Sequence, residues 1–449
     1  MMVYQAEIET MPLARLRVLQ SERLREQVMY VYKKVPFYKK QLDAAGVDPA
    51  SIKGVEDIHR LPFTRKTDLR DNYPFGLFAV PQSEIARIHC SSGTTGKPTV
   101  VSYTKGDLDI FSECIARSLT AAGCRPGMLL QNAYGYGLFT GGLGLHYGAE
   151  RLGMTVLPIS GGMTDRQIAL LQDFGADAIC CTPSYALTIA EELVRRGIDK
   201  NSLKLKLAIL GAEPWTEAIR ANVEAGLGVT ATNIYGLSEV MGPGVSQEDC
   251  DEKGTGSYIW EDHFYPEVVD KDTHEPLPEG KPGVLVFTTL SKKAMPVLRY
   301  YTNDITSIYY DKGGKRSHIK MGQIIGRSDD MLIIRGVNLF HTQVEAALQG
   351  FAELSSNYRL IVKREGAMDE VDVEVELDSN LYHELWPEAA ASGDMKANDR
   401  VGLMYRTLQK KIKDNIGLTM KVHLLAPGEI PRSEGGKLNR IVDTRKKDK

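Results

Sequence analysis

Residues 154–184 read MTVLPISGGMTDRQIALLQDFGADAICCTPS, and this stretch sets the fold class. An apolar run at 154–160 is followed by an amphipathic segment at 164–175 and by a second apolar run at 178–184. Strand, helix and strand in succession predict a βαβ unit, whose two strands lie parallel in one sheet. The same alternation continues on both sides, with apolar runs at 128–134, 205–211 and 229–236. We therefore predict a large α/β domain whose parallel sheet is covered by helices.

Unusual residues follow several of these predicted strands, where parallel sheets form their binding crevice. After the run at 128–134, Tyr136 and Phe139 alternate with glycines, among them Gly141. Aromatic rings among glycines can wall a flat apolar pocket while the backbone closely approaches a ligand. Aromatic core packing beside a glycine-rich helix start is the alternative.

Two further strand ends carry polar groups. The segment GAEPW at 211–215 closes one run and opens a helix, with Pro214 near the first turn. The segment NIYGLSE at 233–239 places an aromatic ring, a hydroxyl and a carboxylate on one short turn. Such a trio can stack on a base, contact a phosphate and hold Mg²⁺. A turn with only a structural role is the alternative.

The segment CSSGTTGKPTVV at 90–101 is typical of a phosphate-binding loop. Four hydroxyl residues are interleaved with Gly93 and Gly96, so backbone N–H and side-chain O–H groups can converge on one anion. Lys97 adds a positive charge, and Pro98 in the next position excludes the Walker pattern, which needs Ser or Thr there. A surface turn rich in Ser and Gly is the alternative.

Composition limits the protein class. The chain of 449 residues is too long for one compact core, so two or three domains are expected. Its formal net charge of −3 argues against a nucleic acid or an anionic membrane as a partner bound by bulk charge. No apolar run reaches the length of a membrane span and the acidic N-terminus is unlike a signal peptide, so we expect a cytoplasmic protein.

The 6 cysteines show no C-x-x-C spacing, so the sequence indicates neither a disulfide framework nor a zinc knuckle. Cys250 lies with Asp249, Asp251 and His263 in one irregular region. A structural metal site is conceivable there, although acidic loops with a nearby histidine are mostly only solvated.

The remaining segments define the domain organisation. In residues 1–80, apolar residues recur at helical spacing and predict a helical lead-in. In residues 258–325, alternating runs separated by turns rich in Pro and Gly predict antiparallel strands. Within the latter, Asp304 ends the run RYYTND and is a candidate acceptor for ribose hydroxyls, a surface-turn aspartate being the alternative. The segment GRSDD at 326–330 marks a predicted boundary between domains at 1–326 and 327–449.

The second domain is predicted to be a small α+β unit. A capping box at 342–345 begins one helix, and a second helix is expected near 401–416. Alternating apolar residues at 371–377 predict a strand. The domain ends in a Gly-Gly loop that presents Lys437.

With these motifs in hand, the chain resembles the adenylate-forming superfamily of acyl-CoA synthetases, and within it the phenylacetate–coenzyme A ligases. The resemblance covers nearly the whole chain and is carried by six motifs in order: LPFTRKTDLRDNYPFGLFAVP, SSGTTGKPTVV, NAYGYGLFTGGLGLHYGAERLG, GAEPW, IWEDHFYP and GRSDDMLIIRGVNLF. It implies a large N-terminal domain that binds ATP and the acid, and a small mobile C-terminal domain. It further implies ATP-dependent ligation of phenylacetate or a close aryl acid to coenzyme A through an acyl-adenylate, in aromatic acid catabolism.

The resemblance also assigns residues to the nucleotide. The β- and γ-phosphates would be held by Ser91, Ser92, Gly93, Thr94, Thr95, Gly96 and Lys97. The adenine and α-phosphate would lie against Gly211, Ala212, Glu213, Tyr235, Gly236 and Ser238. Glu239 would hold Mg²⁺, and Asp304 would bind the ribose with help from Arg327. Asp329 would be the hinge, and Lys437 would reach the carboxylate during adenylation.

The acid is expected against an aromatic pocket formed by Tyr136, Phe139, Gly141, Ala212 and Pro214. Asn303 stands where many members of the superfamily have Gly, a change we expect to be neutral. Relatives of this length suggest a homodimer.

Two other functions stay open. The enzyme could pass its acyl or adenylyl group to a carrier-protein thiol or to a deazaflavin coenzyme, as relatives do, and dependence on free coenzyme A separates these from a ligase. A non-catalytic nucleotide-binding protein is disfavoured because Lys437, Glu239 and Asp304 occur together.

Overall fold

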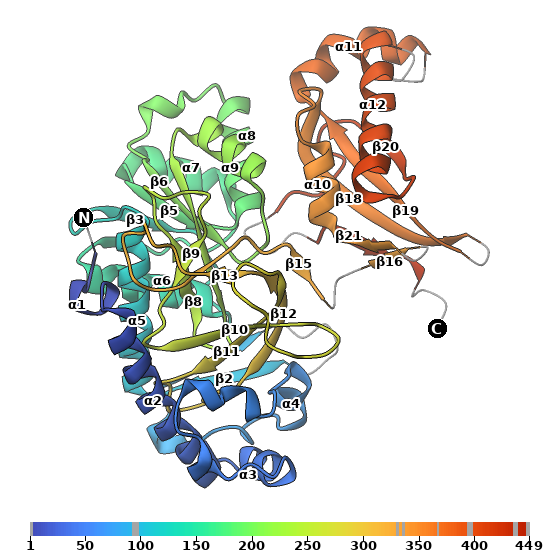
Figure 1. Cartoon of the computed structure of the whole chain (residues 1–449). Helices are drawn as coiled ribbons and strands as arrows, with labels where there is room; N and C mark the ends of the chain where they lie inside the picture. The colour runs from blue at the N-terminus through green and yellow to red at the C-terminus, as the bar shows by residue number, and fades with distance from the viewer. Residues whose placement is uncertain are drawn as a thin grey trace. The chain divides into compact units, whose positions relative to one another are not determined.

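The computed structural model describes residues 3–91, 98–328, 332–334, 337–365, 368–392, 398–433 and 439–445. It contains a larger unit, mainly Met1–Ala212 and Val223–Ile324, and a smaller one, mainly Ile325–Ser433 with Glu213–Asn222. The larger unit runs from blue to yellow in Figure 1, and the part of the smaller unit after residue 325 runs from orange to red. Each is described by itself.

The larger unit contains a nine-stranded sheet in the order β13-β14-β9-β8-β7-β6-β5-β3-β4. Figure 1 labels β3, β5, β6, β8, β9 and β13 of this sheet. Its parallel part consists of β3 (Leu129–Asn132), β4 (Thr155–Leu157), β5 (Ala178–Cys181), β6 (Leu207–Gly211) and β7 (Thr230–Leu237). The antiparallel part consists of β8 (Gly242–Glu248), β9 (Ser257–Ile259), β13 (Ile308–Tyr309) and β14 (Lys320–Met321). The predicted parallel sheet is therefore confirmed, with antiparallel strands added at one side.

Helices connect the parallel strands as the βαβ pattern predicts. They are α6 (Thr140–Leu152), α7 (Thr164–Phe174), α8 (Pro183–Arg195) and α9 (Glu217–Leu227). The connection from β3 to β4 runs one way along the sheet and the next ones run the other way, so right-handed crossovers place α6 on one face and α7 and α8 on the opposite face. This reversal is a topological switch point, the usual place of a binding crevice.

Further strands of the larger unit carry the predicted nucleotide loops. The antiparallel strands β10 (Phe264–Val269), β11 (Gly283–Thr289) and β12 (Tyr300–Thr306) pair in that order. A separate hairpin pairs β1 (Arg87–Ser91) with β2 (Thr99–Tyr103), with Ser91 opposite Thr99. The predicted phosphate loop thus connects two paired strands, although residues 92–97 lie outside the described part of the chain.

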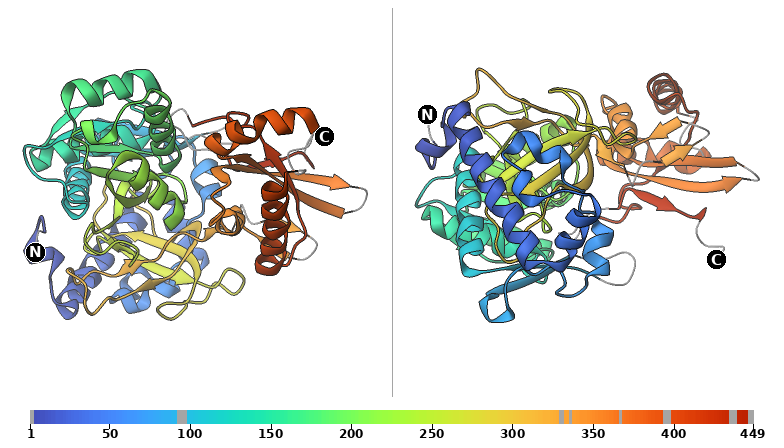
Figure 2. Two further views of the ribbon diagram at one scale, coloured as in Figure 1. Left: turned by 90° about the horizontal axis from the view of Figure 1, so that it is seen from above. Right: turned by 60° about the horizontal axis from the view of Figure 1, so that its bottom comes forward.

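The predicted helical lead-in consists of α1 (Ala6–Glu9), α2 (Leu13–Lys34), α3 (Pro36–Ala44) and α4 (Lys66–Asp71), with short 3₁₀ turns at Pro49–Ser51, Val55–Arg60 and Gln82–Glu84. Leu24, Val28 and Val31 on α2 are fully buried and belong to the main core, together with Phe264 of β10. Figure 2 shows these helices in blue beside the strands of the larger unit. The lead-in therefore completes the core of this unit.

Helix α5 (Lys105–Ala121) also belongs to the larger unit and packs against α6 and β8. Thr104 caps it by accepting from the Asp107 N–H, and the Asp107 carboxylate accepts from the Thr104 N–H. A further 3₁₀ turn spans Lys200–Ser202. None of the described helices is both long enough and apolar enough to span a lipid bilayer.

The smaller unit is α+β, as predicted. Its sheet has the order β20-β19-β18-β21, formed by β18 (Leu354–Glu365), β19 (Met368–Leu377), β20 (Lys421–Leu425) and β21 (Ile441–Asp443). Its helices are α10 (His341–Leu348), α11 (Ser379–Ser392) and α12 (Asp399–Ile416), and it also holds β15 (Gly326–Arg327), β16 (Leu332–Ile334) and β17 (Val337–Leu339). Val371, Val373, Val375 and Leu377 are buried on β19, as their alternation predicts.

The predicted capping box at 342–345 is wrong in register. Helix α10 begins at His341, and the Phe340 N–H donates to Gln343 Oε1 at 3.0 Å. Thr342 is already inside the helix, and its hydroxyl donates to the Ile325 carbonyl. Phe340 has no side-chain oxygen to cap the helix, so the sequence gives no S/T-x-x-E/Q signal for the start that the helix adopts.

Candidate active site

The turn at 238–241, directly after β7, carries two of the predicted nucleotide residues. Ser238 and Glu239 are both 5% exposed. Two buried side chains hold the turn through its carbonyls: the Tyr103 hydroxyl donates to Met241 O at 2.6 Å, and Lys292 Nζ donates to Val240 O at 3.1 Å. The turn is therefore fixed by side chains from β2 and from the segment after β11.

A hydroxyl pair joins this turn to the glycine-rich loop after β3. Thr140 Oγ1 and Ser238 Oγ lie 3.0 Å apart, and both side chains are buried. Thr140 is the first residue of α6 and directly follows Phe139. The predicted acid-binding loop and the predicted α-phosphate residue thus lie side by side.

The same loop also reaches the hairpin that leads into the predicted phosphate loop. The Leu138 carbonyl accepts from the Cys90 N–H at 2.9 Å and from His89 Nδ1 at 3.1 Å. Cys90 directly precedes Ser91, the last residue of β1. Phe139 is 38% exposed, and its ring leaves no room for a Cβ at Gly141, whose ideal Cβ would lie 2.6 Å from Phe139 Cε1.

Tyr235 and Asp304 meet, although 68 residues separate them in the chain. The Tyr235 hydroxyl donates to Asp304 Oδ2 at 2.6 Å, and its ring stacks on Phe287 with centroids 6.4 Å apart. A ring and a carboxylate at one spot suit a purine and its ribose hydroxyls. Asn303 has φ = +68°, a left-handed conformation that Asn tolerates better than most non-glycine residues, so Asn suits a position where the resemblance leads us to expect Gly.

The glycines in this region have a packing reason. An ideal Cβ at Gly236 would lie 1.8 Å from Gly242 O, and one at Gly211 would lie 2.1 Å from Ile234 O. The next residue, Ala212, has φ = +73°. The neighbouring strands therefore lie too close together for side chains at these two positions, so that a ligand bound here would contact backbone groups.

Lys66 is a residue that the sequence reasoning missed. Its Nζ lies 3.7 Å from Glu239 Oε1, and its side chain is 33% exposed. Lys66 is the first residue of α4. It lies in LPFTRKTDLRDNYPFGLFAVP, the first of the six motifs that carry the resemblance, to which the sequence assigned no role. Spacing could not have revealed this contact because α4 and β7 are distant in sequence.

Lys292 was also missed, and it is the most unusual charge near the turn. The side chain is fully buried, and its Nζ lies 4.6 Å from the centre of the Tyr103 ring. Burial lowers the pKa of Lys292 to about 8, while the charges of Asp107 and Glu239 act in the opposite direction. The Lys292 ammonium therefore lies under the turn, where its Nζ donates to the Val240 carbonyl.

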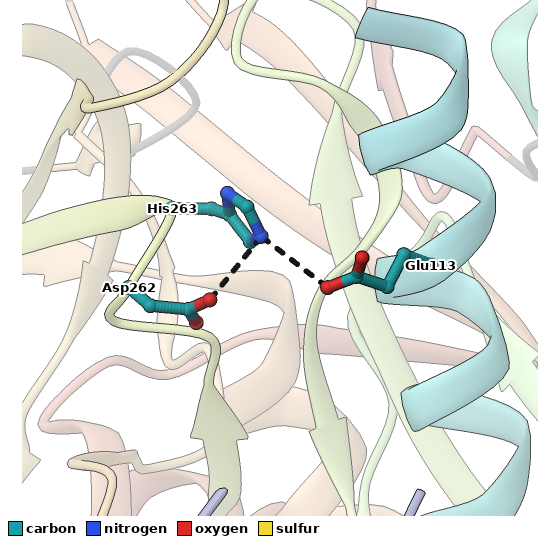
Figure 3. Close-up of side chains that lie close together, drawn as sticks. All are labelled: Glu113, Asp262 and His263. Atoms are coloured by element: carbon teal, nitrogen blue, oxygen red, sulfur yellow. Dashed lines mark ion pairs between the residues drawn. The ribbon is translucent and has the colours of Figure 1, made fainter. Parts of the chain in front are cut away.

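Of the four residues considered for a metal site, Asp249, Cys250 and Asp251 lie together, whereas His263 lies apart from them. His263 lies with Glu113 and Asp262, not with Cys250, in the cluster of Figure 3. Its Nε2 lies 3.2 Å from Asp262 Oδ2 and 3.6 Å from Glu113 Oε1, and Nδ1 lies 2.7 Å from Ser291 Oγ. Asp249 instead pairs with lysine and arginine side chains at 315 and 316.

The Glu113–Asp262–His263 cluster is already charge-compensated. Arg117 donates to both oxygens of Asp262, at 2.8 and 3.0 Å, and to Glu113 Oε1 at 2.5 Å. Burial alone would raise the pKa of Glu113, but the contacts with His263 and Arg117 lower it to about 2. Arg151 adds a further positive charge 3.6 Å from Glu113 Oε2. The guanidinium groups of Arg117 and Arg151 thus neutralise the two carboxylates, and we interpret this cluster as a structural ion-pair network.

Several predicted site residues are not placed. The side chains of Ser91–Lys97, together with Asp329 and Lys437, lie outside the described residues. Glu213, Pro214 and Arg327 belong to the smaller unit, so their part in this site stays a prediction. Within the larger unit, the structure brings together three groups: the turn at 238–241, the Tyr235–Asp304 pair and the loop after β3.

Family models match both parts of the chain. The model described as AMP-binding enzyme matches residues 3–291, and the model described as AMP-binding enzyme C-terminal domain matches 336–445. The chain is 61% identical to the phenylacetate-coenzyme A ligase of Thermus thermophilus over 446 residues, covering 99% of this chain and 100% of that one. It is 49% identical to the phenylacetate-coenzyme A ligase of Escherichia coli K12 over 442 residues, covering 98% of this chain and 97% of that one.

Solved structures show the same fold. A 2-hydroxyisobutyryl-CoA ligase in the postadenylation state, in complex with R3-HIB-AMP, has a TM-score of 0.88 and 28% identity. The match covers 98% of this chain and 92% of that one. The same ligase in complex with 2-HIB-AMP and CoA in its thioesterification state has a TM-score of 0.72 and 29% identity, covering 99% and 93% of the two chains.

Proposed function

Since the chain belongs to the family of AMP-binding enzymes, we propose that it ligates phenylacetate to coenzyme A, converting ATP to AMP and pyrophosphate. The observation that carries the proposal is the 61% identity to a phenylacetate-coenzyme A ligase over 99% of the chain. Relatives of the same name from three further organisms are 49–52% identical over at least 95% of the chain.

The chemistry has two steps. A carboxylate oxygen of the acid attacks the α-phosphorus of ATP, and the bond to the β-phosphate breaks, so pyrophosphate leaves and an acyl-adenylate forms. The coenzyme A thiol then loses its proton and attacks the carbonyl carbon, and the bond to the AMP oxygen breaks. Both steps bring anions together, so the protein contributes mainly positioning and positive charge.

The described residues fit the nucleotide part of this reaction. Tyr235 and Asp304, joined by a hydrogen bond of 2.6 Å, would hold the adenosine. Ser238 would donate to the α-phosphate, with its hydroxyl oriented by Thr140. The proposed phosphate loop at 91–97 and Gly211 would complete the nucleotide site with backbone groups.

Glu239 suits a magnesium ligand. It is a buried carboxylate at the carboxyl end of β7, and the ion pair with Lys66 Nζ at 3.7 Å supports a site for positive charge beside it. Mg²⁺ in such sites is bound by one or two carboxylates together with substrate phosphates. When bound, it would neutralise charge on the triphosphate.

The smaller part of the chain would supply the remaining groups. We place the domain boundary at 326/327, with Arg327 beside the ribose, Asp329 as the hinge and Lys437 at the carboxylate and α-phosphate during adenylation.

The acid pocket would be walled by Tyr136, Phe139, Gly141, Ala212 and Pro214. We also propose that the enzyme is a homodimer.

The test is acid-dependent AMP release by the purified protein with ATP, Mg²⁺ and coenzyme A. The panel contains phenylacetate, indoleacetate, hydroxyphenylacetates and benzoates. We expect phenylacetate to be preferred and its coenzyme A thioester to be detected by mass spectrometry. AMP release that does not depend on coenzyme A would indicate another acceptor for the acyl group and would refute the proposed ligase activity. Preference for another acid would refute phenylacetate as the substrate.

A further inference from the structure

A chain of four polar side chains runs from the buried end of β3 to the surface of α6. Asn132 Nδ2 lies 2.8 Å from the Tyr136 hydroxyl, which lies 3.1 Å from His146 Nδ1. His146 Nε2 in turn lies 3.1 Å from Glu150 Oε1. Asn132 is fully buried, whereas the side chain of Glu150 is 54% exposed and lines a surface cavity of ≈ 410 Å³.

The direction of the first hydrogen bond is fixed by Asn132. Its Nδ2 also lies 2.8 Å from Gly142 O, and its Oδ1 accepts from the Tyr134 N–H at 3.3 Å. A carbonyl oxygen only accepts and a backbone N–H only donates, so the amide of Asn132 cannot be flipped. Its second N–H therefore points at Tyr136, whose oxygen must accept.

The direction of the other bonds is fixed by Glu150. A carboxylate oxygen accepts, so we assign the Nε2–H tautomer to His146, in which Nε2 donates to Glu150 Oε1 and Nδ1 carries a lone pair. Tyr136 then donates its only proton to His146 Nδ1. Burial raises the pKa of Tyr136, which keeps this proton on the phenol.

We propose that His146 and Glu150 are specificity-determining residues for the aromatic acid. They keep the Tyr136 proton in a hydrogen bond to His146 Nδ1, so the Tyr136 oxygen can only accept a hydrogen bond from a ligand in the acid pocket. The inference rests on the proposed function, in which Tyr136 walls the acid pocket. His146 and Glu150 act through Tyr136 and are positioning residues. A ring substituent that donates a hydrogen bond can bind this oxygen, and the acid that carries it is favoured. A substituent that cannot donate forms no hydrogen bond there.

The experiment compares hydroxyphenylacetates with the fluorophenylacetates of the same ring position, which are similar in size but lack the donor. The ratio of kcat/KM values for each pair is measured in wild type, H146L, H146N and E150Q. At the ring position that reaches Tyr136, wild type is expected to favour the hydroxyl compound roughly 3- to 10-fold.

H146L removes the acceptor, frees the Tyr136 proton, and is expected to reduce this preference to about onefold. H146N keeps an acceptor oxygen near the position of Nδ1 and is expected to restore most of the preference. E150Q alters an exposed side chain, so folding is retained, and it is expected to give an intermediate ratio because His146 is no longer held in one tautomer.

Equal ratios in wild type and H146L, or no ring position with a preference in wild type, would overturn the inference. So would a ratio in E150Q equal to that of wild type, a comparison that holds even if the H146L chain fails to fold. The affinity of each variant for ATP, measured by calorimetry, is expected to be unchanged, and a parallel loss would indicate a merely structural role. Failure of the proposed function gives a different result, namely no phenylacetyl thioester from the wild-type protein.

Discussion

Lys292 is a single residue whose burial has a measurable consequence. Its pKa is lowered to about 8 by burial, against 10.5 in an unfolded chain. Between these two values the unfolded chain binds more protons than the folded one, so the free energy of unfolding rises with pH. Relative to K292M, the wild type is expected to gain about 3 kcal/mol between pH 7 and pH 11.

Urea unfolding of both proteins across this pH range measures the gain. Because other titrating groups are common to the two proteins, their contributions cancel in the difference. Lys293, the exposed neighbour, provides a control, and K293M is expected to follow wild type. A constant difference between wild type and K292M would show that the ammonium is not desolvated.

At this scale, the sequence identified residues whose chemistry is local and missed those defined by contacts. Tyr235 and Asp304 were proposed separately and meet in the structure. Lys66 and Lys292 were not proposed, because a lysine in a sequence has no mark of the carboxylate or carbonyl that it will contact. The same holds for His146, which stands in a quoted motif but acquires a role only through Tyr136.

At the scale of one element, helix α10 is expected to make the smaller unit sensitive to acid. Burial lowers the pKa of His341 to about 4, from 6.5, and its Nδ1 lies 3.1 Å from the Tyr358 hydroxyl, which donates to Glu345. The folded chain therefore binds fewer protons than the unfolded one between pH 4 and 6.5, and stability is lost as pH falls through this range. The loss from this residue is at most about 3 kcal/mol.

Unfolding of the full-length protein between pH 7.5 and 4.5 tests this expectation. H341N keeps a donor near the position of Nδ1 and does not titrate, so it is expected to lose less stability than wild type over this range. His383, exposed on α11 of the same unit, supplies the control variant H383N. Identical slopes for wild type and H341N would remove His341 as the cause.

Elements were predictable where burial gives a clear period. The strand at Ala178–Cys181 is apolar throughout because it is buried on both faces, and the alternation at 371–377 marks a strand with one buried face. Helix α10 begins after Phe340, which is not one of the residues that usually cap a helix, so its start could not be predicted from the capping pattern. His263 lies with Glu113 of α5 and not with the acidic loop at 249–251, because a partner from a distant helix leaves no local pattern in the sequence.

At the scale of the whole molecule, the two half-reactions should depend on different groups. Lys437 is proposed to act only in adenylation, so K437A is expected to slow pyrophosphate release on the order of 10²-fold or more. Thioester formation from supplied phenylacetyl-adenylate is expected to survive, because no charge on the triphosphate is then at stake. Equal losses in both half-reactions would contradict this role.

The hinge variant should show the opposite pattern. Proline at position 329 fixes φ and removes a backbone donor, so D329P is expected to restrict rotation of the C-terminal domain. Pyrophosphate release would then continue while coenzyme A-dependent turnover falls. If D329P spares turnover with coenzyme A, the hinge lies elsewhere. K437A is expected to impair adenylation and D329P thioester formation. If the C-terminal domain moves to serve both steps, the two variants lose different half-reactions. If changes in this domain simply disable the enzyme, both variants lose both half-reactions.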